Sequence, residues 1–182
     1  MTELAQQLNF LLALGTIAIQ IVTVVLAVLL LLERYKQKTF RVLTISGTYG
    51  IQLVFFISLA SVGISLFYSE ILGFIPCGLC WLQRIFLYPQ VILAGMAWYK
   101  KDSKIADYLI VLSSVGAVVA LYQHYLQMGG SAFIPCPAVG PSIDCAQRFL
   151  FEFGYITFPL MSFSVFALII VLLMTVKSRN KV

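Results

Sequence analysis

Two cysteines stand close together in the stretch FIPCGLCWLQRIFLYP, residues 74–89. Cys77 and Cys80 are separated by two residues, at the front edge of an apolar segment. A Cys-x-x-Cys pair can bind a metal ion, form a structural disulfide or exchange electrons with another thiol pair. The remaining residues have to discriminate between these three chemistries.

A second cysteine pair lies further along the chain. Cys136 in IPCPAVG and Cys145 in IDCAQR have eight residues between them. Two pairs are the minimum for a relay in which thiolate attack passes a disulfide from one pair to the other. Two static disulfides are an alternative. A zinc site is less favoured, because structural zinc sites commonly use two close pairs and only Cys77 and Cys80 have that spacing. Pro137 also removes a backbone N–H beside Cys136 that could have stabilised a bound thiolate.

Arg84 follows the first pair and is expected to lie about one turn inside a membrane edge. Pro76 favours a helix start near Cys77. On such a helix Cys77, Cys80 and Arg84 share one face. A helix N-terminus and a guanidinium group both stabilise a thiolate, which is the reactive form of cysteine. A charge at that depth is costly and indicates a function, whereas a snorkelling arginine that reaches the headgroups is the alternative.

His124, within ALYQHYLQ, is the sole histidine of the chain. At the outer end of a predicted span, its imidazole could donate to a bound redox partner or exchange protons with it. The alternative is a histidine that is hydrogen-bonded in an interfacial belt with Tyr122 and Tyr125.

The composition places these residues in a membrane protein. Of the 182 residues, 61% are hydrophobic and 10% are charged, and the mean hydropathy is +0.99. A spanning helix needs roughly 20 predominantly apolar residues. Five stretches reach that length: about 8–32, 43–68, 81–99, 106–126 and 155–176. We expect an all-α polytopic membrane protein, with a four-helix transmembrane bundle as its core and one extra N-terminal transmembrane helix.

The basic residues predict the orientation of the spans. Ten of the twelve lie between the first two spans, between the third and fourth, or at the C-terminus: Arg34, Lys36, Lys38, Arg41, Lys100, Lys101, Lys104, Lys177, Arg179 and Lys181. By the positive-inside rule this side is the cytoplasm. The net charge of +5 thus reflects topology, and no basic face indicates nucleic-acid binding.

The opposite side then carries the N-terminus, the loop 127–154 and all four cysteines. It is expected to be an oxidising compartment, where thiol pairs form disulfides. The leader MTELAQQLNF contains no Lys or Arg, so the first span is expected to be an uncleaved anchor with its N-terminus outside.

A thiol relay needs an electron acceptor. The sequence shows no haem motif, nucleotide loop or flavin fingerprint. A quinone dissolved in the membrane fits, because its ring needs a polar donor such as Arg84 beside an apolar slot and its isoprenoid tail needs only lipid.

Taken together, these motifs resemble a known family. The run FIPCGLCWLQRIFLYP, then YQHYLQ, then PCP and DCAQRFLFEFG before the last predicted span, resembles the DsbB/BdbC family of disulfide bond formation proteins over about 45–176. The resemblance implies a quinone-dependent protein thiol-disulfide oxidoreductase of a bacterial-type cytoplasmic membrane, the relay already known from the DsbA–DsbB–quinone system. The acceptor would be ubiquinone or menaquinone.

The resemblance also implies roles for individual residues. Cys136 and Cys145 would accept electrons from a DsbA-like thioredoxin-fold partner on the outer face, with Cys136 as the sulfur attacked. The electrons would pass to Cys77 and Cys80. In this scheme Cys80 contacts the quinone and Arg84 helps to polarise it.

Two further points concern the match. His124 corresponds to a family position linked to quinone binding. Residues 1–40 form an extra N-terminal span and basic loop, apart from the DsbB-like four-helix domain expected over 41–182.

Two alternative functions stay open: a vitamin K epoxide reductase-like protein, whose loop cysteines would precede the Cys-x-x-Cys, and a non-enzymatic membrane protein with structural disulfides.

Overall fold

Helices make up almost all of the structure. The computed structural model describes residues 3–36, 40–134, 136 and 144–179. Three residues used above lie outside these ranges: Lys38, Pro137 and Lys181. Within them there are helices and no strand, only an isolated bridge between Glu152 and Ile156. The predicted all-α class is confirmed.

The long helices have the lengths that a bilayer requires. They are α1 (Glu3–Lys36), α2 (Arg41–Leu66), α3 (Gly78–Lys100), α4 (Ala106–Gln127) and α5 (Phe158–Arg179). A short π-helical turn, η1 (Phe67–Ile71), continues α2. Each long helix is apolar enough to cross a membrane, so the five predicted spans are confirmed within the described residues.

The last helix starts later than the sequence predicts, at Phe158 and not at 155. The preceding residues close a tight turn, in which Glu152 and Ile156 bridge each other. Phe153 and Gly154 have φ values of 52° and 78°, in the left-handed region that a helix does not use. This segment is apolar and aromatic, so composition alone does not distinguish it from a helix.

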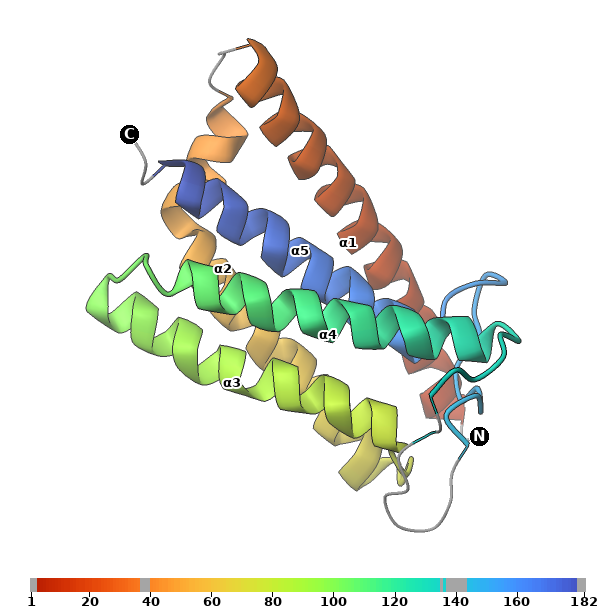
Figure 1. Ribbon diagram of the computed structural model, residues 1–182. Coiled ribbons are helices and arrows are strands. Elements are labelled where there is room, and N and C mark those ends of the chain that lie inside the picture. The colour runs from red at the N-terminus through yellow and green to blue at the C-terminus, as the bar shows by residue number, and fades with distance from the viewer. Residues whose placement is uncertain (1–2, 37–39, 135, 137–143, 180–182) are drawn as a thin grey trace.

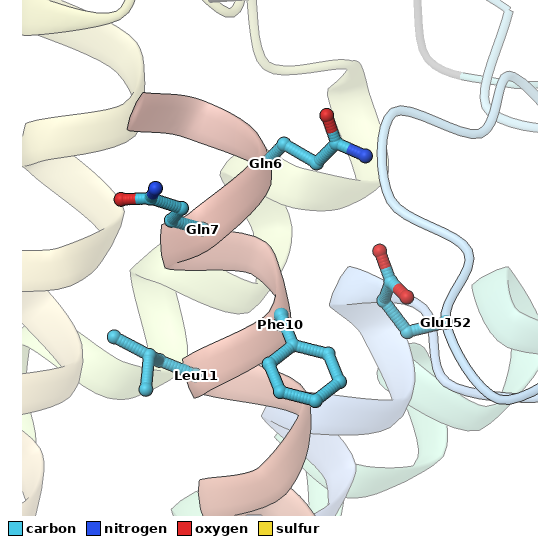
Figure 2. A pocket seen from close by; sticks show the side chains of 5 residues that line it. All are labelled: Gln6, Gln7, Phe10, Leu11 and Glu152. Carbon is cyan, nitrogen blue, oxygen red and sulfur yellow. The ribbon is translucent and has the colours of Figure 1, made fainter. Parts of the chain in front are cut away.

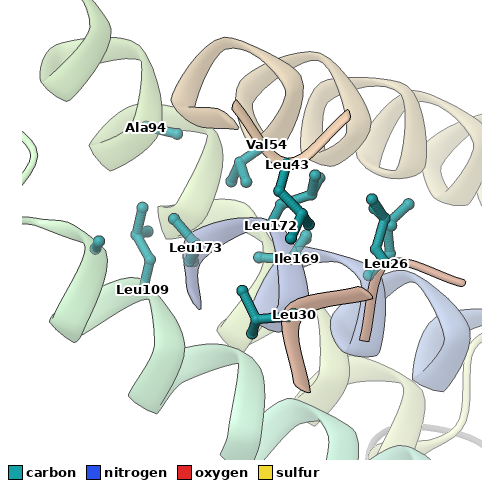
Figure 3. Close-up of a cluster of buried hydrophobic side chains, with 11 residues drawn as sticks. Leu26, Leu30, Leu43, Val54, Ala94, Leu109, Ile169, Leu172 and Leu173 are labelled. Carbon is teal, nitrogen blue, oxygen red and sulfur yellow. The ribbon is translucent and has the colours of Figure 1, made fainter. Parts of the chain in front are cut away.

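The central helix of the bundle is α5. It packs against α1, α2 and α4 (Figure 1), and 56% of its most apolar stretch is buried, compared with 17% for α1. Figure 3 shows the core, in which side chains from all the long helices meet. Its buried residues are Leu26, Leu30, Leu43, Val54, Ala94, Ala106, Leu109, Leu168, Ile169, Leu172 and Leu173. This apolar contact holds α5 in the middle of the bundle.

The outward faces of the helices are also apolar. Val24, Ile92, Val111 and Val118 are each more than 60% exposed, at 62%, 65%, 63% and 67%. A soluble protein does not expose apolar side chains on every helix, whereas lipid tails cover them at no cost. The chain is therefore a multi-pass membrane protein.

The ion pairs and the thiols lie at opposite ends of the bundle. Figure 1 shows the end of α5 and the α3–α4 link at one end, and the start of α1 and the end of α4 at the other. At the first end Arg179 pairs with Glu33 at 2.8 Å, and Lys177 pairs with Asp107. The second end, where α3 begins and α4 finishes, carries the cysteines.

Candidate functional site

The first thiol pair, Cys77 and Cys80, which we call the inner pair, sits at the N-terminus of α3. Cys77 is the N-cap residue, and its Sγ accepts a hydrogen bond from the backbone N–H of Cys80 at 3.4 Å. The helix start predicted near Cys77 is thus confirmed. The two sulfur atoms lie 2.9 Å apart and are not joined by a disulfide.

The contact between the two sulfurs changes how Cys77 ionises. The hydrogen bond to Cys80 raises the pKa of the Cys77 thiol above its ordinary value, and burial raises this pKa further. Cys77 therefore holds its proton and can donate it to the sulfur of Cys80.

Two glutamines, which the sequence analysis missed, hold the inner pair. The Nε2 of Gln123, on α4, donates to Cys77 Sγ at 3.0 Å and to Cys80 Sγ at 3.2 Å. Gln83 Nε2 donates to Gln123 Oε1 at 2.6 Å, which fixes the orientation of the Gln123 amide. The sequence could have indicated them, because both glutamines lie inside predicted spans, where a buried amide must find hydrogen-bond partners.

Arg84 points into the bundle and not toward the headgroups. It is 7% exposed, its Nε donates to Ser65 Oγ at 2.9 Å, and its Nη2 donates to the Ser65 carbonyl at 2.8 Å. Its guanidinium also lies over the Trp81 ring, 5.1 Å from the centroid. The snorkelling alternative is therefore wrong. Within the described residues Arg84 pairs with no carboxylate, so a buried positive charge is left without an anion.

A cavity of about 380 Å³ opens beside these side chains. Cys80, Gln83, Arg84 and Gln123 form its polar end, and most of the other lining residues are apolar. Sites for small molecules occupy roughly 300–1,000 Å³ and combine an apolar lining with a few convergent polar groups. Cys80 lines the cavity and Cys77 does not, so the two thiols face different surroundings.

The donors at the polar end indicate what the cavity can hold. Arg84 uses two of its nitrogens for Ser65, and its other N–H groups are available to a ligand oxygen. Among the described residues no Asp or Glu lines the cavity, so a cationic ligand would meet no counter-charge from them. The site therefore fits an apolar molecule that carries a hydrogen-bond acceptor, such as a carbonyl oxygen, at one end.

The second pair, Cys136 and Cys145, which we call the loop pair, is joined by a disulfide. Hydrogen bonds to α4 hold the chain on both sides of this disulfide. Tyr122 Oη donates to the Ile134 carbonyl at 2.8 Å and accepts from the Ile134 N–H at 2.9 Å. Gln127 Nε2 donates to the Gln147 carbonyl at 2.9 Å.

Both thiol pairs belong to one apolar cluster. Cys77 and Cys145 are buried in it, at 5% and 1% exposed, and Cys80 and Cys136 pack against it. The predicted convergence of the pairs at one end of the bundle is therefore seen. In the described part of the chain, no group of three His, Cys, Asp or Glu side chains is arranged to hold a metal ion.

His124 takes a different position from the other candidates. Its Nδ1 lies 2.9 Å from Thr157 Oγ1, just before α5, and it does not line the cavity of Cys80 and Arg84. The structure thus brings together five of the six candidates, and the role of His124 in acceptor binding stays a prediction.

A second hollow lies on the surface at the start of α1. Figure 2 shows its lining, with four side chains from α1 and Glu152 from the segment before α5: Gln6, Gln7, Phe10, Leu11 and Glu152. Among the described residues, no thiol and no basic side chain lines this hollow, whereas Cys80 and Arg84 both line the other cavity.

The comparisons with known proteins agree on one family. The family model "Disulfide bond formation protein DsbB" matches residues 48–176. The chain is 43% identical over 130 residues to the SPbeta prophage-derived disulfide bond formation protein B of Bacillus subtilis, covering 70% of this chain and 86% of that protein. It is 35% identical over 119 residues to disulfide bond formation protein C of the same organism, covering 64% and 83%.

A third relative is the probable disulfide formation protein C 2 of Bacillus anthracis, 34% identical over 131 residues, which covers 72% of this chain and 92% of that protein. No solved structure matches the chain significantly. Because the family match extends over the thiol pairs and four of the five long helices, the chain belongs to the DsbB family of disulfide bond formation proteins.

Proposed function

We propose that this protein reoxidises an extracytoplasmic, DsbA-like thioredoxin-fold thiol oxidase and passes the electrons through its two cysteine pairs to a membrane quinone. One observation carries the proposal. Both thiol pairs lie in one cluster, and one sulfur, Cys80, faces a largely apolar cavity in which Arg84 meets no carboxylate of the described residues.

The outer step is a thiol–disulfide exchange at the loop pair. A thiolate of the reduced partner attacks Cys136, which forms a mixed disulfide and releases the Cys145 thiolate. The second thiol of the partner then attacks the mixed disulfide. The partner leaves oxidised, and Cys136 and Cys145 hold two electrons as a dithiol.

The inner step returns the loop pair to its disulfide. The dithiol of Cys136 and Cys145 reduces a disulfide between Cys77 and Cys80, and two electrons move to the inner pair. The structure has the loop pair oxidised and the inner pair reduced. In this scheme it corresponds to the state that follows the transfer.

The inner pair then has to deliver its electrons to the acceptor. A quinone supplies a two-electron, two-proton acceptor, and the inner pair closes to a disulfide as quinol forms. Arg84 is placed to donate to a carbonyl oxygen at the polar end of the cavity. Gln123 keeps both sulfurs in reach of each other, and Cys77 holds a proton that has to leave when the disulfide closes.

The proposed location is a bacterial-type cytoplasmic membrane, with the N-terminus outside and the C-terminus in the cytoplasm. The support is the distribution of charge, since most basic residues of the described chain, Arg84 and Arg148 excepted, gather at the end opposite to the thiols. This places both cysteine pairs on the oxidising side.

The test uses purified protein, a reduced thioredoxin-fold partner and excess quinone without oxygen, and follows the quinone absorbance. We expect catalytic loss of the absorbance in the wild type and none above background in Cys80→Ser or Cys136→Ser. An unchanged rate in either variant contradicts the relay. A wild type that oxidises the partner without consuming quinone contradicts the acceptor.

A further inference from the structure

Helix α1 lies outside the part of the chain that the family match explains. The match begins at residue 48, whereas α1 ends at Lys36. A helix that served only as an anchor would need no particular contact with the redox site. The lining of the cavity beside Cys80 nevertheless includes residues of α1.

We propose that α1 forms a wall of the acceptor cavity and contacts the apolar part of the bound quinone directly, so that it contributes to acceptor affinity and selectivity. This inference rests on the proposed function, because it names a further part of the same acceptor site.

The α1 residues that line the cavity form one continuous face. They are Leu11, Leu12, Gly15, Thr16 and Ile19, spaced as one side of a helix. At 1.5 Å per residue this face extends for about 12 Å along the axis of α1. It is therefore longer than a single ring and can accommodate a quinone head together with the first part of an apolar tail.

The chemistry of this face suits the apolar part of a ligand. None of its residues is charged, and the hydroxyl of Thr16 is already used, because its Oγ1 donates to the Leu12 carbonyl at 2.8 Å. The polar groups that can meet a carbonyl oxygen, Arg84 and Gln123, come from α3 and α4. Helix α1 thus offers contact area, and the hydrogen bonds come from elsewhere.

Specific contacts hold α1 in this position. Asn9 and Tyr68 are both buried, and Tyr68 Oη donates to Asn9 Oδ1 at 2.7 Å, which links α1 to η1 at the cavity that Tyr68 also lines. Further along, Gln20 Nε2 donates to Ser164 Oγ on α5 at 3.0 Å. Helix α1 packs mainly against α5 and touches α2 only sparsely. The cavity lies between α1 and α2, where its lining includes Gly15 and Ser61.

Gly15 marks where the wall borders open space. A Cβ added at Gly15 would meet no heavy atom within 4 Å. Because Gly15 lines the cavity and a Cβ there is unobstructed, we expect a larger side chain to occupy space assigned to the quinone. Gly63 on α2 also has open space around a Cβ but does not line the cavity, so it provides a matched control.

The first experiment uses the wild-type protein in lipid nanodiscs and a benzoquinone with a photoreactive group on a short alkyl tail. We expect the probe to label peptides within residues 11–19, and excess decyl-benzoquinone to suppress this labelling. Labelling that is confined to the other helices, or that the competitor does not suppress, overturns the proposal.

The second experiment compares Gly15→Phe with Gly63→Phe. We expect Gly15→Phe to raise the Kd for decyl-benzoquinone, measured by quenching of tryptophan fluorescence, and the quinone KM by roughly tenfold or more. The KM for the partner should stay unchanged, and Gly63→Phe should behave like the wild type. Gly15→Ala and Gly15→Leu should give smaller effects in order of volume, which preserves the test if Gly15→Phe misfolds.

The two proposals fail in different ways. If the wild type reduces no quinone, the proposed function fails. If the wild type reduces quinone and the Gly15 series has the same quinone Kd and KM as Gly63→Phe, only the role of α1 fails.

Discussion

The inner pair and the loop pair consist of the same residues in very different surroundings. Cys77 and Cys80 lie on a helix N-terminus, where the Gln123 amide reaches both sulfurs. Cys136 and Cys145 lie in a segment outside the long helices, which α4 holds from both sides through Tyr122 and Gln127. The inner pair thus belongs to a helix of the bundle, whereas the loop pair is connected to the bundle through hydrogen bonds to α4.

This difference matches the two tasks that a relay has to perform. A pair that exchanges disulfides with another protein must be approached from outside, so a loop is the suitable place. A pair that reacts with a molecule in a cavity needs a fixed geometry, because rates depend steeply on the alignment of the reacting atoms. The surroundings of the thiols, and not the thiols themselves, therefore separate the two halves of the proposed reaction.

The largest effects should come from breaking one pair at a time. In Cys145→Ser no loop disulfide can form, so we expect no oxidation of the partner even in the first turnover. In Cys77→Ser the loop disulfide is intact, and we expect one equivalent of partner per chain to be oxidised before the reaction stops. Quantifying free thiols after rapid mixing measures both. A first-turnover burst in Cys145→Ser, or continued turnover in Cys77→Ser, would remove the division of tasks.

Replacing the buried charge should weaken the acceptor half alone. We expect Arg84→Met to raise the quinone KM by roughly 10- to 100-fold, because a hydrogen bond to a charged group is worth about 1.5–3 kcal/mol. The partner KM should stay the same. The matched control is Arg148→Met, since Arg148 lies over the Phe151 ring and does not line the cavity. A larger change in the partner KM than in the quinone KM would take Arg84 out of the acceptor site.

Two glutamines on α4 allow a direct comparison of the pairs. Gln123→Leu removes both donors to the inner sulfurs, and we expect the rate of quinone reduction by the inner pair to fall roughly tenfold. Gln127→Leu removes the tie to the loop segment, and we expect a rise of about threefold in the partner KM with the quinone step unchanged. Stopped-flow measurements of the two half-reactions separate these effects. Equal effects of both variants on one half-reaction would contradict the assignment.

The smallest effect should come from His124. Because His124 contacts Thr157 and does not line the cavity, we expect His124→Phe to raise the quinone KM by about threefold or less. Steady-state kinetics with the quinone as the varied substrate measures this change. A rise as large as that of Arg84→Met would show that the histidine reaches the acceptor.

Much of the fold could be predicted from residues taken in order along the chain. The five spans follow from apolar length, because a membrane-crossing helix satisfies its own backbone hydrogen bonds. The start of α3 follows from Pro76 and Cys77, a local preference. The start of α5 does not, since the turn around Phe153 and Gly154 is as apolar as the helix that follows. The division into units 1–40 and 41–182 stays a prediction.

The sequence by itself determined the class of protein, the separation of most basic residues from the thiols, and the motifs that place the chain in its family. These are properties of composition and short spacing, which need no knowledge of neighbours. The tertiary structure alone decided that Gln123 holds both inner sulfurs, that Ser65 receives Arg84, and that Gly15 borders the same cavity. These contacts join residues of different helices, and they depend on how the helices pack in three dimensions.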